Sequence, residues 1–172
     1  MCQWMSGWAT RDGDLLTHPA TDAHVDLAES FGINDIMPAD DPRRTATPIE
    51  YSSGGRLDDL SSYRLRYDAR RPAWATDEWE ARIIAKCRAR IEACIVRDAR
   101  IILLGGAWIL AGKASVKRAA SARILAMYDS SRVGVLLDSS RVGELYDSSH
   151  VGVLCDSSCV EHDRRGAMKE RP

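Results

Sequence analysis

The chain has few of the features that would place it in a membrane, in a secretory pathway or among disordered proteins. It has 172 residues but only one phenylalanine, and its net charge is −1. Its longest apolar run, residues 101–112, is broken by glycine and is too short to span a bilayer. With 45% apolar and 28% charged residues, the composition excludes a disordered chain. The first residues carry no basic leader and no apolar signal core, so we expect a cytoplasmic protein.

The cysteines do not suggest a disulfide framework. They are odd in number and irregularly spaced: Cys2, Cys87, Cys94, Cys155 and Cys159. This favours free thiols in a reducing compartment. His150 and His162 lie near the last two cysteines, but a zinc site needs four converging ligands and is typically signalled by paired Cys-x-x-Cys motifs. We therefore expect no metal and no cofactor.

Charge is segregated along the chain. Residues 1–62 hold eleven acidic residues against four arginines, whereas residues 80–123 hold ten lysines and arginines against three acidic residues. Residues 129–163 return to seven acidic residues against two arginines. Blocks of this kind can pair within one fold, so the small net charge says little about partners.

One nine-residue phrase is repeated near the end of the chain. It begins at Asp129 (DSSRVGVLL), Asp138 (DSSRVGELY) and Asp147 (DSSHVGVLC), and a last copy at Asp156 stops after DSSCV. Asp, Ser and Gly favour turns and Val favours extended chain, so each copy predicts a short strand and a corner. A helix is disfavoured, because nine residues make about two and a half turns and would rotate successive valines to opposite faces.

Two copies make eighteen residues, a length that can close one coil of a parallel β-solenoid. Stacked coils would place Val133 on Val151, Val142 on Val160, and Leu136 on Leu154, with Asp and Ser columns at the corners. The predicted fold class is mainly β: a short parallel β-solenoid of about 18 residues per coil. It is capped by an amphipathic α-helix and preceded by a small α/β N-terminal region.

The N-terminal half has weaker patterns. Residues 22–32 read as a short helix ended by Gly32. Three prolines and two glycines in residues 37–56 predict an irregular connector. The alternation from Tyr63 to Tyr67 predicts a strand with one buried face.

The clearest helix is expected from about Glu78 to Val96, with Asp77 as its N-cap. Its apolar face would hold Ile84, Cys87, Ile91 and Ile95, and we expect it to cover the first coil. The predicted domains are residues 1–98, an N-terminal α/β region with the capping helix at 78–96; residues 99–163, the solenoid; and residues 164–172, a charged flexible tail.

The phrases resemble those of a known group of repeat proteins. Gly105-Gly106-Ala-Trp-Ile-Leu-Ala-Gly and the later copies are similar to uncharacterised bacterial and bacteriophage proteins with tandem Asp-Ser-Ser-x-Val-Gly-x-Leu repeats. The resemblance covers residues 100–160 and implies a β-solenoid behind a small N-terminal region. It also implies the host cytoplasm as the location if the protein is phage-encoded. It implies no activity and no catalytic residues.

Three other chemical sites have partial signals. Gly112-Lys113 resembles a phosphate loop, but five residues separate Gly106 from Gly112 and Ala114 follows the lysine, so a solenoid corner is favoured. The recurring Asp resembles calcium-binding β-rolls but lacks paired glycines beside it. Hexapeptide acyltransferases share the eighteen-residue coil but depend on a catalytic histidine, and none is clearly placed here. We therefore expect no catalytic residues.

The positions that vary between copies are those free to face water. The fourth residue of the phrase is Arg132, Arg141, His150 and then Cys159, and the seventh includes Glu144. We expect a solenoid face with Arg132, Arg141, His150 and Glu144 to bind another protein, and the open C-terminal coil to allow self-association. The predicted function is a non-enzymatic structural or protein-interaction module, with no membrane among its partners.

An alternative function uses a basic stripe on the long helix: Arg82, Lys86, Arg90 and Arg97, with Arg88, Lys117 and Arg118 nearby. The protein would then be a nucleic-acid-associated or host-directed accessory protein of the phage type. The stripe is more typical of a solvated helix face or of a partner for the acidic N-terminal segment. A hexapeptide-acyltransferase-like enzyme is a third possibility.

Overall fold

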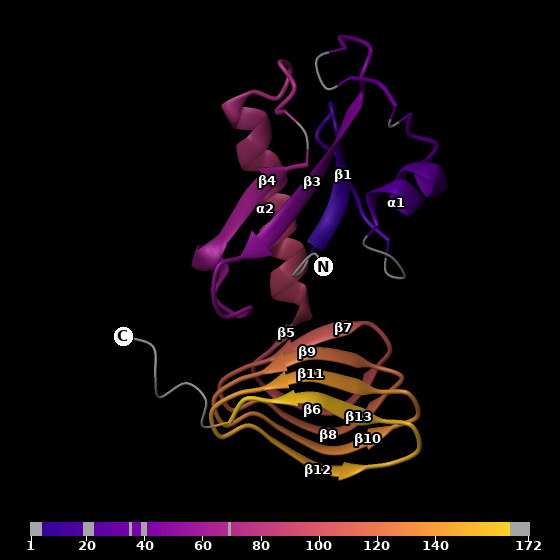
Figure 1. Ribbon diagram of the computed structural model, residues 1–172. Helices are drawn as coiled ribbons and strands as arrows, with labels where there is room; N and C mark the ends of the chain where they lie inside the picture. The colour runs from indigo at the N-terminus through magenta and orange to yellow at the C-terminus, as the bar shows by residue number, and fades with distance from the viewer. Residues whose placement is uncertain (1–4, 19–22, 35, 39–40, 69, 166–172) are drawn as a thin grey trace. The chain divides into compact units, whose positions relative to one another are not determined.

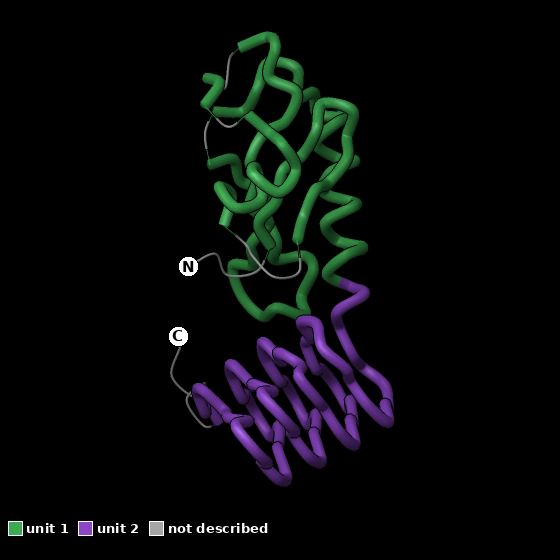
Figure 2. Tube along the Cα trace, turned by 90° about the vertical axis from the view of Figure 1, so that its right-hand side faces the viewer, with its two compact units in different colours: residues 1–91 green, residues 92–172 purple. Residues whose placement is uncertain are grey.

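The structure is a computed structural model, and it describes residues 5–18, 23–34, 36–38, 41–68 and 70–165. The chain forms two compact units, residues 1–91 and 92–172 (Figure 2). Among the described residues, no helix is long and apolar enough to cross a bilayer. Of the predicted tail, only Arg164 and Arg165 lie within the described residues.

The first unit is built on an antiparallel sheet of four strands in the order β2-β1-β3-β4 (Figure 1). The strands are β1 (Met5–Thr10), β2 (Leu15–Leu16), β3 (Ala46–Ser53) and β4 (Tyr63–Tyr67). Helix α1 (His24–Phe31) ends at Gly32, whose left-handed conformation closes the C-cap, and a 3₁₀ turn (Leu60–Ser62) precedes β4. The predicted helix at residues 22–32 and the predicted strand at Tyr63–Tyr67 are confirmed.

The predicted irregular connector at residues 37–56 is wrong in its second half, because β3 is a central strand of the sheet. Proline is normally excluded from such strands because it cannot donate a ladder hydrogen bond. Pro48 lies opposite Trp8 of β1, but the pairing of β3 with β4 begins only at Ile49. Pro48 therefore has a partner strand on one side only. Ile49 and Tyr51 then bury their side chains almost completely.

Helix α2 (Asp77–Cys94) packs on this sheet. Trp79 Nε1 donates to the carbonyl oxygen of Thr10 at 2.9 Å, and Arg88 Nε donates to the hydroxyl of Tyr51 at 3.1 Å. The buried face has the expected spacing but is displaced from the predicted one: Trp79, Ile83, Cys87 and Ile91 are buried, and Ile84 is only partly so. The displacement follows from Trp79, the largest apolar side chain of the helix, which stands four residues before Ile83.

Both ends of α2 differ by one or two residues from the prediction. Thr76 rather than Asp77 caps the helix, since its Oγ1 accepts from the N–H of Trp79 at 3.2 Å. The helix stops at Cys94, and Ile95–Val96 forms strand β5. The role of α2 as a cover for the first coil stays a prediction.

The second unit is a parallel β-solenoid, as predicted, and it has about four turns (Figure 1). The even-strand sheet consists of β6 (Ala99–Leu104), β8 (Ser115–Ala120), β10 (Arg132–Leu137) and β12 (His150–Leu154). The odd-strand sheet consists of β5 (Ile95–Val96), β7 (Ala107–Leu110), β9 (Arg123–Met127), β11 (Arg141–Leu145) and β13 (Cys159–Asp163). All pairings within both sheets are parallel.

The predicted stacking register is confirmed. Val133 pairs with Val151, Leu136 with Leu154, and Val142 with Val160. The solenoid core contains Val133, Leu136 and Val142 at 0% exposure, together with equivalents from earlier coils such as Val116 and Ile124. No single copy could bury these side chains alone, so stacking supplies the core.

Coil length is not constant. Register partners are eighteen residues apart between Arg132 and His150, seventeen between Ser115 and Arg132, and sixteen between Ala99 and Ser115. The exact phrase is therefore confined to the full-length coils. The shorter first coils keep the inward apolar positions but lose the letter-for-letter repeat, which explains why only a degenerate signal precedes residue 129.

Candidate functional site: the outer surface of the solenoid

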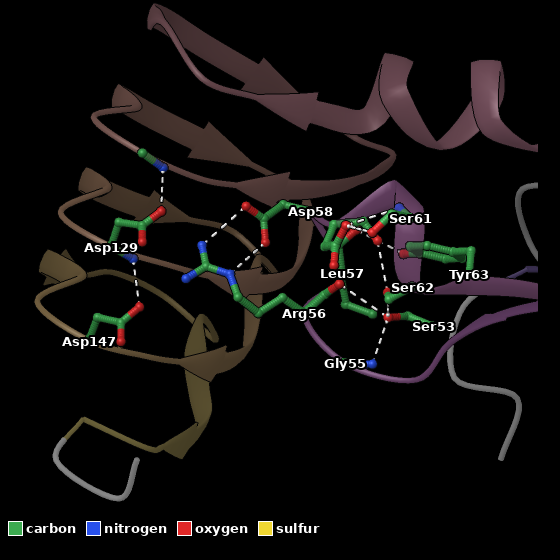
Figure 3. Close-up of polar contacts among 12 residues, drawn as sticks. Ser53, Gly55, Arg56, Leu57, Asp58, Ser61, Ser62, Tyr63, Asp129 and Asp147 are labelled. Atoms are coloured by element: carbon green, nitrogen blue, oxygen red, sulfur yellow. Dashed lines mark hydrogen bonds and ion pairs between the residues drawn. The ribbon is translucent and has the colours of Figure 1, made fainter. Parts of the chain in front are cut away.

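The aspartate of each phrase forms a corner of the solenoid. Asp129, Asp138, Asp147 and Asp156 all have φ between 54° and 58°, the left-handed region that Asp tolerates better than most residues. The carboxylate of one corner accepts the backbone N–H of the corner in the preceding coil. Gly112 donates to Asp129 Oδ2 at 2.8 Å, and Asp129 donates to Asp147 Oδ2 at 3.0 Å (Figure 3). The aspartates are thus used for stacking, as the corner interpretation predicted.

The serines that follow are also used by the fold. The third residue of the phrase is buried at Ser131, Ser140 and Ser149. The hydroxyl of Ser140 donates to the carbonyl oxygen of Ala119 at 3.0 Å and accepts the N–H of Ala122 at 3.2 Å. At Ser140 these bonds join one coil to the next across a corner. The hydroxyls of Ser131 and Ser149 are buried at the equivalent positions without a hydrogen-bond partner among the described residues.

The glycine of each phrase is required by close approach of neighbouring coils. A Cβ on Gly134 would lie 2.7 Å from the carbonyl oxygen of Lys117, and one on Gly143 would lie 2.6 Å from that of Leu125. Both distances are shorter than real Cβ contacts. The glycine also explains how Val133 and Leu136, three residues apart, both face inward. Pairing skips the Gly134 position, and Val135 resumes opposite Arg118.

The predicted binding residues lie on the outside of the solenoid, but on two different sheets. Arg132 and His150 are exposed register partners in the even-strand sheet. Arg141 belongs to the odd-strand sheet, where it lies between Arg123 and Cys159 and approaches Glu161 at 3.8 Å. The structure therefore does not bring the predicted set together on one face.

Glu144, the fourth predicted residue, is engaged within the odd-strand sheet. It accepts a hydrogen bond from the hydroxyl of Tyr146, and Arg164 Nε lies 3.7 Å from its other oxygen. Burial and the bond to Glu144 raise the pKa of Tyr146, whose ring stacks on Tyr128 with centroids 5.0 Å apart. Glu144 is thus half-buried in a local network.

The even-strand sheet presents a different surface. Its four strands contain no Asp or Glu, whereas the odd-strand sheet contains Glu144, Glu161 and Asp163. Exposed cations and aliphatic side chains lie together on it. We call this surface the basic–aliphatic face: Ile101, Ile102 and Leu104 on β6, Lys117 and Arg118 on β8, and Arg132 on β10.

Cations and aliphatic side chains are direct neighbours on this face. Ile102 is 44% exposed and pairs in register with Arg118, which pairs in turn with Val135. No ion pair joins Lys117, Arg118 or Arg132 to a described residue. In contrast, Arg97, Arg100 and Arg141 have acidic partners.

Sequence reasoning missed the three aliphatic residues of this face, and it assigned Lys117 and Arg118 to the neighbourhood of the basic stripe rather than to a face of the solenoid. Within the apolar run Ile101–Leu104, only Leu103 is buried. A usable signal was present, because a strand with one buried face cannot bury four consecutive large apolar side chains. Such a run therefore predicts exposed apolar surface unless a second layer covers the strand.

The four residues of the basic stripe have different surroundings in the structure. Lys86 Nζ donates to the carbonyl oxygen of Gly13 at 2.6 Å and lies 3.2 Å from Asp14 Oδ1. Arg97 follows β5 rather than lying on α2, and pairs with Glu92 at 2.6 Å. Arg82 and Arg90 are exposed on the helix. Lys86 thus partners the acidic N-terminal segment, as the sequence suggested.

Other side chains that could take part in catalysis or binding make local contacts instead. His24 pairs with Asp68 through Nδ1, and its Nε2 lies 3.1 Å from the carbonyl oxygen of Ile49. In the loop before β4, the hydroxyls of Ser53 and Ser62 are 2.7 Å apart, and Ser53 Oγ accepts the N–H of Gly55 (Figure 3). These bonds shape the first unit.

The thiols and the Gly112-Lys113 pair have structural roles. Burial raises the pKa of the Cys87 thiol to about 12, so this thiol stays protonated at neutral pH. Cys155 and Cys159 are half-buried free thiols, and the described residues contain no cluster of His, Cys, Asp and Glu suited to a metal ion. Gly112 has φ of 64° and forms a solenoid corner, as predicted.

Comparison with other proteins adds no further assignment: the chain matches no family model, no curated protein and no solved structure.

Proposed function

We propose that the protein is a non-enzymatic interaction module and that the outward side chains of its solenoid bind another protein. The observation that carries this proposal is the division of roles within the repeat. Inward Val and Leu, corner Asp and Ser, and the close-approach Gly are all used by the fold. The outward side chains are the ones that remain available for recognition.

The test removes the outward side chains and leaves the fold intact. A variant with Arg132→Ser, Arg141→Ser and His150→Ser should keep the wild-type circular dichroism spectrum, because changes at exposed side chains alter stability little. Immobilised wild type and variant would be exposed to an extract of the cells that produce the protein. Bound proteins would be quantified by mass spectrometry, and binding would be repeated with the purified partner.

We expect the variant to lose the partner that the wild type retains. Recovery of the same proteins in the same amounts by both would contradict the proposal.

A second function, self-association, is favoured by the last coil. β12 ends the even-strand sheet, and Leu154 is 49% exposed although its register partner Leu136 is 0% exposed. β12 has no acidic residue, lysine or arginine, so two copies can meet without like-charge repulsion. β13 ends the other sheet with Glu161 and Asp163, charges that discourage strand addition.

The pattern of β12 also fits a second copy of itself. Val151 and Leu154 are the register partners of the buried Val133 and Leu136, and two residues, Gly152 and the exposed Val153, lie between them. This order is symmetric about the Gly152–Val153 peptide bond, so antiparallel pairing with a two-fold-related β12 about that bond would set Val151 opposite Leu154. Val153→Lys should therefore convert a dimer to a monomer in light scattering. Val25→Lys, the same change at a more exposed position on α1, should not. Identical masses for all three proteins would contradict this proposal.

Nucleic-acid binding through the basic stripe has weaker support, because Lys86 and Arg97 have acidic partners. If it occurs, Arg82→Glu with Arg90→Glu should abolish it, and the affinity should fall steeply with salt.

A further inference from the structure

We propose that the basic–aliphatic face is the recognition surface and that its partner is an acidic protein segment carrying aliphatic side chains. This inference rests on the proposed function, since it names the face and the chemistry of the partner. The face holds three cations without a described ionic partner, on a sheet whose strands contain no acidic residue. A binding surface with a single sign of charge favours a partner of the opposite sign and steers its approach.

The aliphatic side chains define the second property of the partner. Ile101 is 74% exposed and Leu104 is 67% exposed, on the strand next to Lys117 and Arg118. Exposed apolar side chains gathered on one strand mark an interaction site. An anion alone would leave them in water, whereas a segment with both acidic and aliphatic side chains covers them while it neutralises the cations.

The same strands disfavour the other anionic macromolecules. Single-stranded nucleic acids are held by aromatic side chains that stack on bases, and membrane interfaces are enriched in Trp and Tyr anchors. β6, β8, β10 and β12 contain no Trp, Tyr or Phe. A surface of aliphatic groups and cations without Trp, Tyr or Phe therefore favours an acidic polypeptide as the partner.

The test uses a short fluorescein-labelled peptide of alternating Glu and Leu, with the full-length protein and fluorescence anisotropy as the readout. The peptide should bind the wild type, and binding should weaken as salt is raised. Lys117→Glu with Arg118→Glu should weaken binding by at least about tenfold. The matched control, Lys113→Glu with Arg123→Glu, makes the same charge change at exposed positions outside the even-strand sheet and should leave binding unchanged.

The aliphatic half of the face is tested separately. Ile102→Asn with Leu104→Asn leaves every charge in place, and should weaken peptide binding by about tenfold through loss of apolar contact. A peptide of alternating Glu and Ser should bind the wild type correspondingly less well.

Each contrary result has a distinct meaning. Equal loss of binding in the test and control charge variants would overturn the assignment to this face, and retained binding in the Ile102 and Leu104 variant would overturn the aliphatic requirement. Tighter binding of phosphatidylserine vesicles or of a single-stranded oligonucleotide than of the peptide would overturn the acidic protein as partner. Absence of peptide binding would overturn this inference alone, because the capture experiment above tests the interaction function independently.

Discussion

The last two strands of each solenoid sheet are built from the same phrase, yet the outer surfaces of the two sheets differ. Inside, Val133 and Leu136 of the even-strand sheet are as buried as Val142 and Leu145 of the odd-strand sheet. The glycines of both sheets approach the preceding coil equally closely. Outside, one sheet has no acidic residue, while the other has three on its last strands.

This difference distinguishes the side chains that stacking constrains from those that it leaves free to vary. Inward side chains are buried in both sheets, and the corner aspartates on both sides accept a backbone N–H from the preceding coil. The repeat therefore stabilises both sheets in a similar way. Outward side chains make few contacts within the fold, so their charge can diverge from one sheet to the other. Recognition can therefore be confined to one face without loss of stability.

The largest expected effect comes from the inward leucines. Leu136→Ala and Leu145→Ala should each lower the free energy of unfolding by about 2–5 kcal/mol, because both leave a cavity in the shared core. Leu154→Ala, in the same column but half exposed, should cost about 1 kcal/mol or less. Urea unfolding measures all three. A large difference between the losses of unfolding free energy in Leu136→Ala and Leu145→Ala would show that the two sheets do not contribute equally to stability.

A smaller effect is expected at the close-approach glycines. Gly134→Ala and Gly143→Ala should each destabilise by about 1–3 kcal/mol, since the new Cβ would force neighbouring coils apart. Gly55→Ala is the control, because nothing lies within 4 Å of its Cβ position. Wild-type urea midpoints for Gly134→Ala and Gly143→Ala would show that the coils are not held as closely as described.

The corner aspartates should contribute less to the free energy of unfolding than the close-approach glycines. Asp129→Ala removes the acceptor for the N–H of Gly112 and places alanine at a φ of 58°, which should cost about 1–2 kcal/mol. Asp129→Asn keeps an acceptor oxygen and tolerates the left-handed conformation, so it should cost less. Thermal unfolding compares the two, and equal losses would point to the carboxylate charge as the important property.

The outward cations should have the smallest effect on stability. Arg118→Glu and Arg123→Glu, on opposite sheets, should each change the free energy of unfolding by less than about 0.5 kcal/mol. A larger change at Arg118, measured by urea unfolding, would mean that this side chain supports the fold rather than recognition.

Sequence reasoning predicted the solenoid well because repetition is a signal that needs no knowledge of distant contacts. Once the period is known, the partners of Val133 and Val142 follow from counting. Strand β3 was missed for the opposite reason. Its place between β1 and β4 depends on partners that are distant in sequence, and Pro48 masks its pattern.

The candidate site was predicted only in part. Arg132 and His150 were correctly expected to share an outward column, because the period places them eighteen residues apart. The division of Arg141 and Glu144 onto the other sheet follows from the same period, since nine residues make half a coil. Lys117 and Arg118 lie in a shorter coil, where the period fails and only the structure aligns them with Ile102 and Val135.

The central claim, that one sheet of the solenoid recognises and the other only supports, is tested most directly by nuclear magnetic resonance. The peptide of alternating Glu and Leu would be titrated into ¹⁵N-labelled full-length protein, and the shifts of backbone amides followed. The account predicts that the perturbed amides lie on β6, β8 and β10, around Ile102 and Arg118, while those of β9 and β11 stay unchanged. Perturbations centred on β9 and β11, or spread equally over both sheets, would contradict it.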